Sequence, residues 1–226
     1  EKFAQEIKQA RKNKIVELIH DGDAIDGDHH HSGDVCTISQ KEQADIHIEL
    51  MSEFQKRIGW QAGDKLYYTA GTPVHVGDDE DYIGEQTNAV QDGEYHTHQL
   101  LKLDTNGTHS WFVHHGTGAG TGANEGNMLR NWLKAIQIDA GKDEQRAPDV
   151  VYTGHVHSPT YTNYVYRRKM GFGMVHGIIL PSWQAKTRYA HMVAPVARNK
   201  IGGVYHDITA DGHMVMPPVF SVMETA

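Results

Sequence analysis

The sequence predicts an α/β fold, and three observations support this prediction. Helix-like and strand-like patterns alternate up to about residue 153, and strand-like patterns dominate the rest of the chain. The composition, with 38 % hydrophobic and 22 % charged residues, is typical of a soluble globular protein. A length of 226 residues suits one domain with a sizeable core, although two small domains would also fit. We therefore expect a single domain over residues 1–226.

Three segments have the apolar spacing of amphipathic helices. Their apolar positions are Phe3, Ala4, Ile7 and Ala10 in 1–14, Ala44, Ile48, Leu50, Met51, Phe54 and Ile58 in 40–58, and Met128, Leu129, Trp132, Leu133 and Ile136 in a later segment. Asn124 is expected to cap this later helix. Asp79 and Glu80, within an acidic run at 78–81, indicate a further helix N-terminus, where the helix dipole favours carboxylates.

Strand patterns lie between and after these helices. The apolar run 14–20 is typical of a buried parallel strand, and 64–70 is rich in Tyr and Thr. Asn106-Gly107 separates two further runs and is a strong signal for a two-residue hairpin. The remaining strands are predicted at 98–104, 108–114, 149–153, 160–168, 174–180, 201–208 and 214–223.

Histidine is the unusual feature of the composition. The chain has 17 histidines against 21 lysines and arginines together, and they gather at 29–31, 96 and 98, 114 and 115, and 155 and 157. A single surface histidine is usually a solvated polar residue, but several groups beside predicted strand ends favour metal binding. In an extended segment alternate side chains share a face, so His155 and His157 are expected to approach two adjacent metals.

The candidate ligands each follow a predicted strand. They are Asp23, together with Asp21 or Asp26 as a further candidate, then His75, His114 or His115, His155 and His157. The carboxyl ends of strands in an α/β sheet converge on one crevice. Imidazoles and carboxylates without a thiolate suit two divalent cations, Mn²⁺ first, with Fe, Zn²⁺, Ni²⁺ or Mg²⁺ as alternatives. The glycine-rich loop 117–122 lacks the lysine of a nucleotide-binding P-loop.

The order of these motifs resembles a known family. Gly22-Asp23 with Asp26, then 71–75, His114-His115-Gly116 and Gly154 to His157 (GHVH) resemble the calcineurin-like metallophosphoesterases. The chain is most similar to versions from bacteriophages and their hosts, some of them described as DNA-repair exonuclease-like. The resemblance covers nearly the whole chain, including 179–187. It implies a four-layer α/β/β/α sandwich with a dinuclear metal centre.

The resemblance also implies individual roles. Asp23 would bridge the two metals, His155 would bind one and His157 the other, and His115 rather than His114 would be the central histidine ligand. The implied activity is hydrolysis of a phosphoester, most directly a phosphodiester and including nucleic acid, by metal-activated hydroxide. The alternative is a non-catalytic binding or assembly module with an incomplete metal site. A histidine-rich metal store is a third reading.

Two departures from the family bear on these roles. The family's first strand, which ends in Asp-x-His, does not precede residue 14, so we expect an N-terminally incomplete domain with a weakened first metal site. The strand edge left uncovered would favour pairing with another chain, including a homo-oligomer. The family's Gly-Asn-His loop is here Gly71-Thr72-Pro73-Val74-His75. His75 either replaces the asparagine ligand or assists the leaving group.

Partners and compartment follow from charge and cysteine usage. A net charge of −8 argues against a broadly basic nucleic-acid surface. If the substrate is DNA, Lys186, Arg188 and Arg198 are candidates for phosphate contacts and Trp183 and Tyr189 for base stacking, although surface solvation and packing are the commoner roles. The single Cys36, and the lack of a signal peptide or a long apolar run, predict a cytoplasmic protein without a membrane partner, in the bacterial host if phage-encoded.

Overall fold

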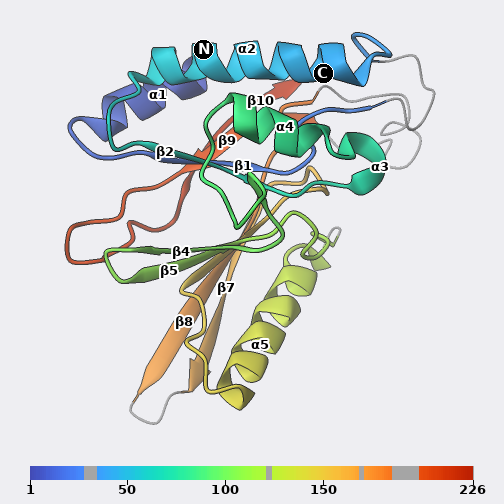
Figure 1. Ribbon diagram of the computed structural model, residues 1–226. Coiled ribbons are helices and arrows are strands. Elements are labelled where there is room, and N and C mark those ends of the chain that lie inside the picture. Colours follow the sequence, from blue (N-terminus) through green and yellow to red (C-terminus); the bar gives the residue numbers. More distant parts are fainter. Residues whose placement is uncertain (28–34, 121–123, 168–170, 185–198, 226) are drawn as a thin grey trace. The chain divides into compact units, whose positions relative to one another are not determined.

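The computed structural model describes residues 1–27, 35–120, 124–167, 171–184 and 199–225 (Figure 1). The chain divides into two compact units. Unit 1 comprises Glu1–Gln99, Gln184–Asn199 and Thr225–Ala226, and unit 2 comprises Leu100–Trp183 and Lys200–Glu224. Helices and strands occur together in both units, so the predicted α/β class is confirmed. Among the described residues, no helix has the length and apolar character needed to cross a membrane.

Unit 1 is built on a three-stranded parallel sheet of order β1-β2-β3. Its elements are α1 (Lys2–Arg11), β1 (Glu17–Asp21), α2 (Gln40–Ile58), β2 (Lys65–Thr69), α3 (Pro73–Val76), α4 (Asp79–Gln86) and β3 (Thr97–His98). Asp21 at the end of β1 lies opposite Thr69 at the end of β2. The loops that follow both strands therefore leave the same edge of the sheet, as the sequence predicted for parallel strands.

The core of unit 1 lies between β2 and two helices. Leu66 and Tyr68 of β2 pack with Ala44 of α2 and Ile83 of α4, and Figure 1 shows these helices beside the strands. Helix α2 has the predicted bounds, because the Ser39 hydroxyl accepts the Glu42 N–H at its start and Gly59 adopts φ +73° at its end. The prediction that Leu50 belongs to the buried apolar face of this helix is wrong, since its side chain is exposed.

Other predictions for unit 1 need correction. Strand β1 begins at Glu17 rather than 14 and is half-buried rather than buried, because it pairs with β2 alone among the described strands. Helix α1 ends at Arg11, whose buried guanidinium pairs with Asp64 at 2.9 Å. The loop predicted at 71–77 contains the short helix α3. The predicted strand 98–104 is present but begins later, at Leu101, because His98 belongs to β3.

Unit 2 contains a five-stranded sheet of order β4-β5-β6-β8-β7. Its elements are β4 (Leu101–Thr105), β5 (Thr108–Phe112), α5 (Asn127–Lys142), β6 (Val150–Thr153), β7 (Thr160–Arg167) and β8 (Phe172–Ile179). The inner strands β5, β6 and β8 are parallel, whereas β4 and β7 run antiparallel to their neighbours. The β4–β5 hairpin confirms the Asn106-Gly107 prediction, because both residues have positive φ and join Thr105 directly to Thr108.

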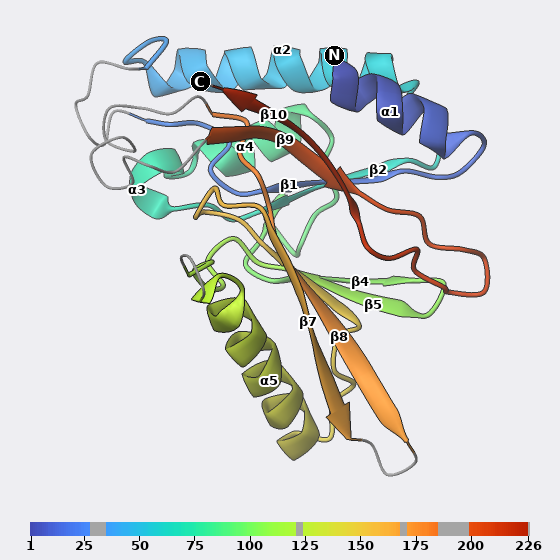
Figure 2. The same ribbon diagram turned by 180° about the vertical axis from the view of Figure 1, so that it is seen from behind.

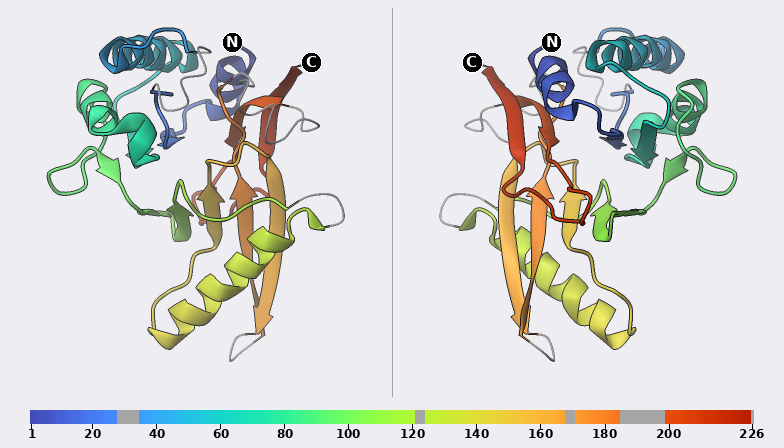
Figure 3. Two further views of the ribbon diagram at one scale, coloured as in Figure 1. Left: turned by 90° about the vertical axis from the view of Figure 1, so that its right-hand side faces the viewer. Right: turned by 90° about the vertical axis from the view of Figure 1, so that its left-hand side faces the viewer.

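Helix α5 covers one face of this sheet. Figure 2 shows it alongside β7 and β8, and the two views of Figure 3 place it in front of the strands from one side and behind them from the other. The predicted positions Leu129 and Leu133 are fully buried. The prediction that Met128 is buried is wrong, because its side chain is exposed. The N-cap position of the helix is Gly126 rather than the predicted Asn124.

The late strands are present but shifted from their predicted positions. Strand β9 (Asn199–Tyr205) pairs with β10 (Val219–Thr225) in a separate two-stranded sheet. The predicted strand 201–208 overlaps β9, and the predicted strand 214–223 overlaps β10. Both strands are therefore confirmed, but each predicted strand begins and ends at different residues from the observed one. Ile208 and Met214 form only an isolated antiparallel bridge between the two strands.

Candidate metal centre

Asp23 lies in unit 1, in the loop that follows β1. Its backbone adopts φ +51°, a left-handed conformation that aspartate adopts more readily than most residues other than glycine. The Thr72 N–H donates to Oδ1 at 2.6 Å, and the Thr72 hydroxyl donates to Oδ2 at 3.2 Å. A Cβ on the neighbouring Gly71 would lie 2.2 Å from the Asp23 nitrogen, so only glycine fits there. The loop after β2 therefore fixes the direction of the Asp23 carboxylate.

Glu80 joins the same two loops from α4. Its side chain is buried, with 2 % exposure. One carboxylate oxygen accepts the Ala24 N–H at 3.1 Å and the other accepts the Gly71 N–H at 2.6 Å. The sequence correctly placed Glu80 in the first turn of a helix, but it did not reveal these bonds. Glu80 is thus a positioning residue for Asp23.

The other carboxylates of this loop accept hydrogen bonds from different partners. Asp21 lies within β1 and accepts the Thr69 hydroxyl at 2.7 Å. Asp26 Oδ1 accepts the Gln184 amide at 2.8 Å. All three carboxylates accept hydrogen bonds, so this geometry does not distinguish among them, and Asp23 stays the predicted ligand of this loop.

His75 lies in α3, and its ring orientation is fixed by a backbone contact. Its Nδ1 is 2.9 Å from the Asp26 carbonyl oxygen. A carbonyl oxygen can only accept, so Nδ1 carries the proton and the lone pair of the neutral ring is on Nε2. Metal-binding histidines are commonly oriented in this way by a carbonyl on the second nitrogen. The same geometry suits a proton acceptor, so it is compatible with both roles predicted for His75.

His47 supports the Asp23 loop from α2, and sequence reasoning missed it. Its ring accepts a hydrogen bond at Nε2 from the Tyr68 hydroxyl at 3.1 Å, and it is also bonded to the Ala24 backbone. Burial lowers the pKa of His47 to about 4, so the ring is neutral at neutral pH. A neutral ring can donate to the Ala24 carbonyl and accept from Tyr68 at the same time. In the sequence, His47 looked like one more polar position of an amphipathic helix.

The histidine cluster of unit 2 is formed by His114, His115 and His155. One nitrogen from each ring lies within 4.8 Å of the other two. The ring centroids of His115 and His155 are 4.3 Å apart, and those of His114 and His155 are 5.5 Å apart. His114 is buried, whereas His115 and His155 are exposed. The sequence left open which of His114 and His115 is the ligand, and the geometry brings both within reach of one ion.

His155 sits in a strained turn directly after β6. Its φ is +64°, and the Val156 N–H donates to the Gly154 carbonyl at 2.8 Å, which closes a three-residue γ-turn. His157 also has a positive φ of +50°. The predicted extended segment with both imidazoles on one face is therefore wrong. His155 joins the histidine cluster, and His157 is not part of it. Strained backbone of this kind is typical of functional sites.

Thr153 holds the start of the histidine cluster against the sheet. This fully buried residue at the end of β6 donates its hydroxyl to the His114 carbonyl at 3.0 Å and accepts the Gly116 N–H at 2.9 Å. A Cβ on Gly116 would lie 2.6 Å from the Thr153 hydroxyl oxygen, so the glycine predicted beside the histidine pair is required sterically. The turn from His114 to Gly116 is thus fixed by one side chain.

The three imidazoles of the histidine cluster are a group that could hold one metal ion. Three imidazole nitrogens around one tetrahedral ion, each about 2.1 Å from it, are about 3.4 Å apart. The three nitrogens lie within 4.8 Å of one another, so the rings would have to come closer together to reach that value. Imidazole ligands suit Zn²⁺, Fe, Ni²⁺ and Mn²⁺ better than Ca²⁺.

Some predicted residues lie elsewhere. His29, His30 and His31, like Lys186, Arg188, Tyr189 and Arg198, are outside the described residues. Trp183 is described and its side chain is exposed, as a stacking residue would need to be. Asp23 and His75 belong to unit 1, and the histidine cluster belongs to unit 2.

Comparison with known proteins gives little further information. No protein-family model matches the chain, and no curated protein sequence does. Among solved structures, the chain is similar to the solution NMR structure of the Thermotoga maritima protein TM1076, at 16 % identity and a TM-score of 0.34. That match covers 71 % of this chain and 80 % of the other.

Proposed function

We propose that this protein is a metal-dependent phosphoesterase whose histidine cluster, His114, His115 and His155, binds a divalent cation. The single observation that supports the metal part best is the convergence of three imidazole nitrogens within 4.8 Å beside a strained turn. Such strain persists only when the surroundings enforce it, and ligand sites are where it concentrates. The phosphoester part rests on the ordered motif series of the sequence and its resemblance to calcineurin-like metallophosphoesterases.

The resemblance extends this proposal beyond the histidine cluster. It would add a second cation, with Asp23 and His157 as further candidate ligands, and a four-layer α/β/β/α sandwich. When bound, such a cation pair neutralises charge on a phosphoryl group and lowers the pKa of water at the site. The substrate we favour is a phosphodiester, including one in DNA.

The protein's own residues would supply orientation and proton transfer. His114 is held by Thr153 through its carbonyl, and Asp23 is held by Thr72 through its carboxylate. His75, with the proton on Nδ1, can accept a proton at Nε2 and return it to a departing oxygen. Preorganised groups of this kind reduce the reorganisation needed during reaction.

Hydrolysis of bis(p-nitrophenyl) phosphate with and without Mn²⁺ tests the proposal. We expect Mn²⁺-dependent turnover that falls at least about 100-fold in Asp23→Ala and in His155→Asn, where asparagine tolerates the positive φ. His213→Ala removes an exposed histidine of unit 2 outside the histidine cluster and is the matched control. Absence of metal-dependent turnover, with Asp23→Ala indistinguishable from the parent, would instead support the non-catalytic binding module.

A further inference from the structure

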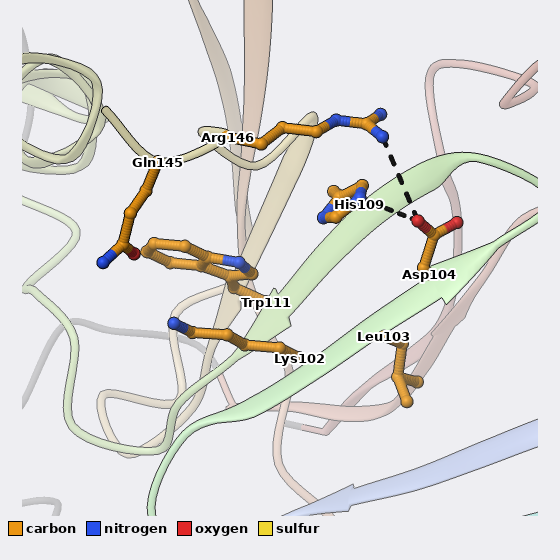
Figure 4. A pocket seen from close by; sticks show the side chains of 7 residues that line it. All are labelled: Lys102, Leu103, Asp104, His109, Trp111, Gln145 and Arg146. Atoms are coloured by element: carbon orange, nitrogen blue, oxygen red, sulfur yellow. Dashed lines mark ion pairs between the residues drawn. The ribbon is translucent and has the colours of Figure 1, made fainter. Parts of the chain in front are cut away.

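A second site lies on the β4–β5 hairpin of unit 2. A hollow of about 350 Å³ opens there, within the size range of small-molecule pockets. The strand register sets Lys102 opposite Trp111 and Asp104 opposite His109, so these four side chains share one face of the hairpin. Gln145 and Arg146, just beyond α5, complete the rim (Figure 4). None of these residues belongs to the histidine cluster.

Trp111 forms the wall of the hollow. Its indole is half-buried and packs against the core formed by Leu133, Val151 and Val175, which holds the ring in place. The Lys102 ammonium lies over the ring, 4.7 Å from the centroid. Lys102 itself is exposed, and a cation–π contact at an exposed site is weak. A flat ring can therefore replace the ammonium over the indole while the ammonium remains within reach of an anion.

The charges around Trp111 argue against binding several anionic groups within the hollow itself. Asp104 lies 2.7 Å from His109 Nε2 and 3.9 Å from the Arg146 guanidinium. Arg146 also pairs with Asp149 at 3.1 Å. The two carboxylates thus balance Arg146 and Lys102, and the site is close to neutral. Such a site suits a neutral aromatic ring with at most one attached anionic group.

The polar groups that face the indole indicate which ring would fit. Figure 4 shows the Gln145 amide beside one end of the Trp111 ring and the Lys102 ammonium near the same end, whereas Arg146 is directed toward Asp104. An amide offers one acceptor and two donor hydrogens to a ring edge. Stacking on an aromatic side chain is how proteins hold unpaired bases.

We propose that this hollow binds an unpaired nucleobase. The base stacks on Trp111, its edge bonds to the Gln145 amide, and the Lys102 ammonium pairs with the attached phosphate. The base has two sources, a free nucleotide or a single-stranded nucleic acid, and both present the same chemistry to the site. This inference does not rest on the proposed phosphoesterase activity, because none of its residues is a candidate metal ligand.

Equilibrium binding to the whole chain in the presence of EDTA tests the inference without metal. Adenosine monophosphate, adenosine, ribose 5-phosphate and a short single-stranded oligodeoxynucleotide are the probes. We expect Trp111→Ala to weaken binding of base-containing probes roughly 5- to 150-fold, and Trp111→Phe to retain most of it. Lys102→Ala should weaken adenosine monophosphate about two- to fivefold and leave adenosine unchanged. Lys134→Ala, an exposed lysine of α5, is the charge-matched control.

The outcomes separate cleanly. Binding of adenosine monophosphate alone supports a free nucleotide, and binding of the oligonucleotide as well supports a base within a strand. The inference is overturned if no base-containing probe binds, or if ribose 5-phosphate binds as tightly as adenosine monophosphate. It is also overturned if Trp111→Phe, with parental circular dichroism, loses most of its affinity for base-containing probes. The same holds if Lys102→Ala, with parental circular dichroism, binds adenosine monophosphate as tightly as the parent does.

Discussion

Replacing Glu80 should destabilise unit 1 more than any other single carboxylate change in α4. The buried bond to the Gly71 N–H is expected to contribute up to about 3 kcal/mol, and the partly buried bond to the Ala24 N–H about 1–2 kcal/mol. Burial of the carboxylate offsets part of this gain. We therefore expect Glu80→Ala to lower the free energy of unfolding by about 3–4 kcal/mol, a large share of typical protein stability.

Urea unfolding followed by circular dichroism measures this loss, and hydrogen exchange of the Gly71 amide locates it. Glu80→Gln keeps the shape and one acceptor oxygen but sets an amide N–H against a backbone donor, so its loss should be intermediate, about 2 kcal/mol. Glu85→Ala, an exposed glutamate of the same helix, should change stability by less than about 0.5 kcal/mol. A loss below about 1 kcal/mol in Glu80→Ala, with Gly71 exchange unchanged, would refute the positioning role.

Three further predictions concern other residues. Burial lowers the pKa of His206 from 6.5 to about 4, so as the pH falls the unfolded state binds a proton before the folded state does. The free energy of unfolding should therefore be highest above pH 6.5 and fall by up to about 3 kcal/mol toward pH 4. Urea unfolding at a series of pH values should show a smaller fall in His206→Gln than in the parent. Gly71→Ala should lower the melting temperature through its backbone clash, whereas Gly141→Ala, which meets no atom within 4 Å in α5, should raise it slightly. Thr153→Val removes the hydrogen bond to the His114 carbonyl and should lower the free energy of unfolding by about 1–3 kcal/mol. The same change should weaken Mn²⁺ binding, which isothermal titration calorimetry measures.

Elements with a local signal could be predicted from the sequence. The bounds of α2 depend on the cap at Ser39 and the glycine that follows Ile58, and both are adjacent to the helix in the chain. The signal for the β4–β5 hairpin is Asn106-Gly107, which lies between its two strands. Both signals can be read from neighbouring residues in the sequence.

Features that depend on distant partners could not be predicted. Glu80 acts on Ala24, 56 positions away, and nothing in an acidic run distinguishes it from its neighbours. The buried pair of Arg11 and Asp64 likewise joins residues 53 positions apart. At the histidine cluster, the sequence identified the right residue types, but the γ-turn at His155 changed which of them meet.

The central claim is that His114, His115 and His155 bind a divalent cation together. Titration of the chain with Mn²⁺, monitored by electron paramagnetic resonance of the unbound ion, tests it most directly. We predict a bound Mn²⁺ that is lost in both His115→Ala and His155→Asn and kept in His213→Ala, each variant having the parental circular dichroism spectrum. Equal Mn²⁺ binding by the parent and all three variants, or no binding by the parent, would contradict the claim.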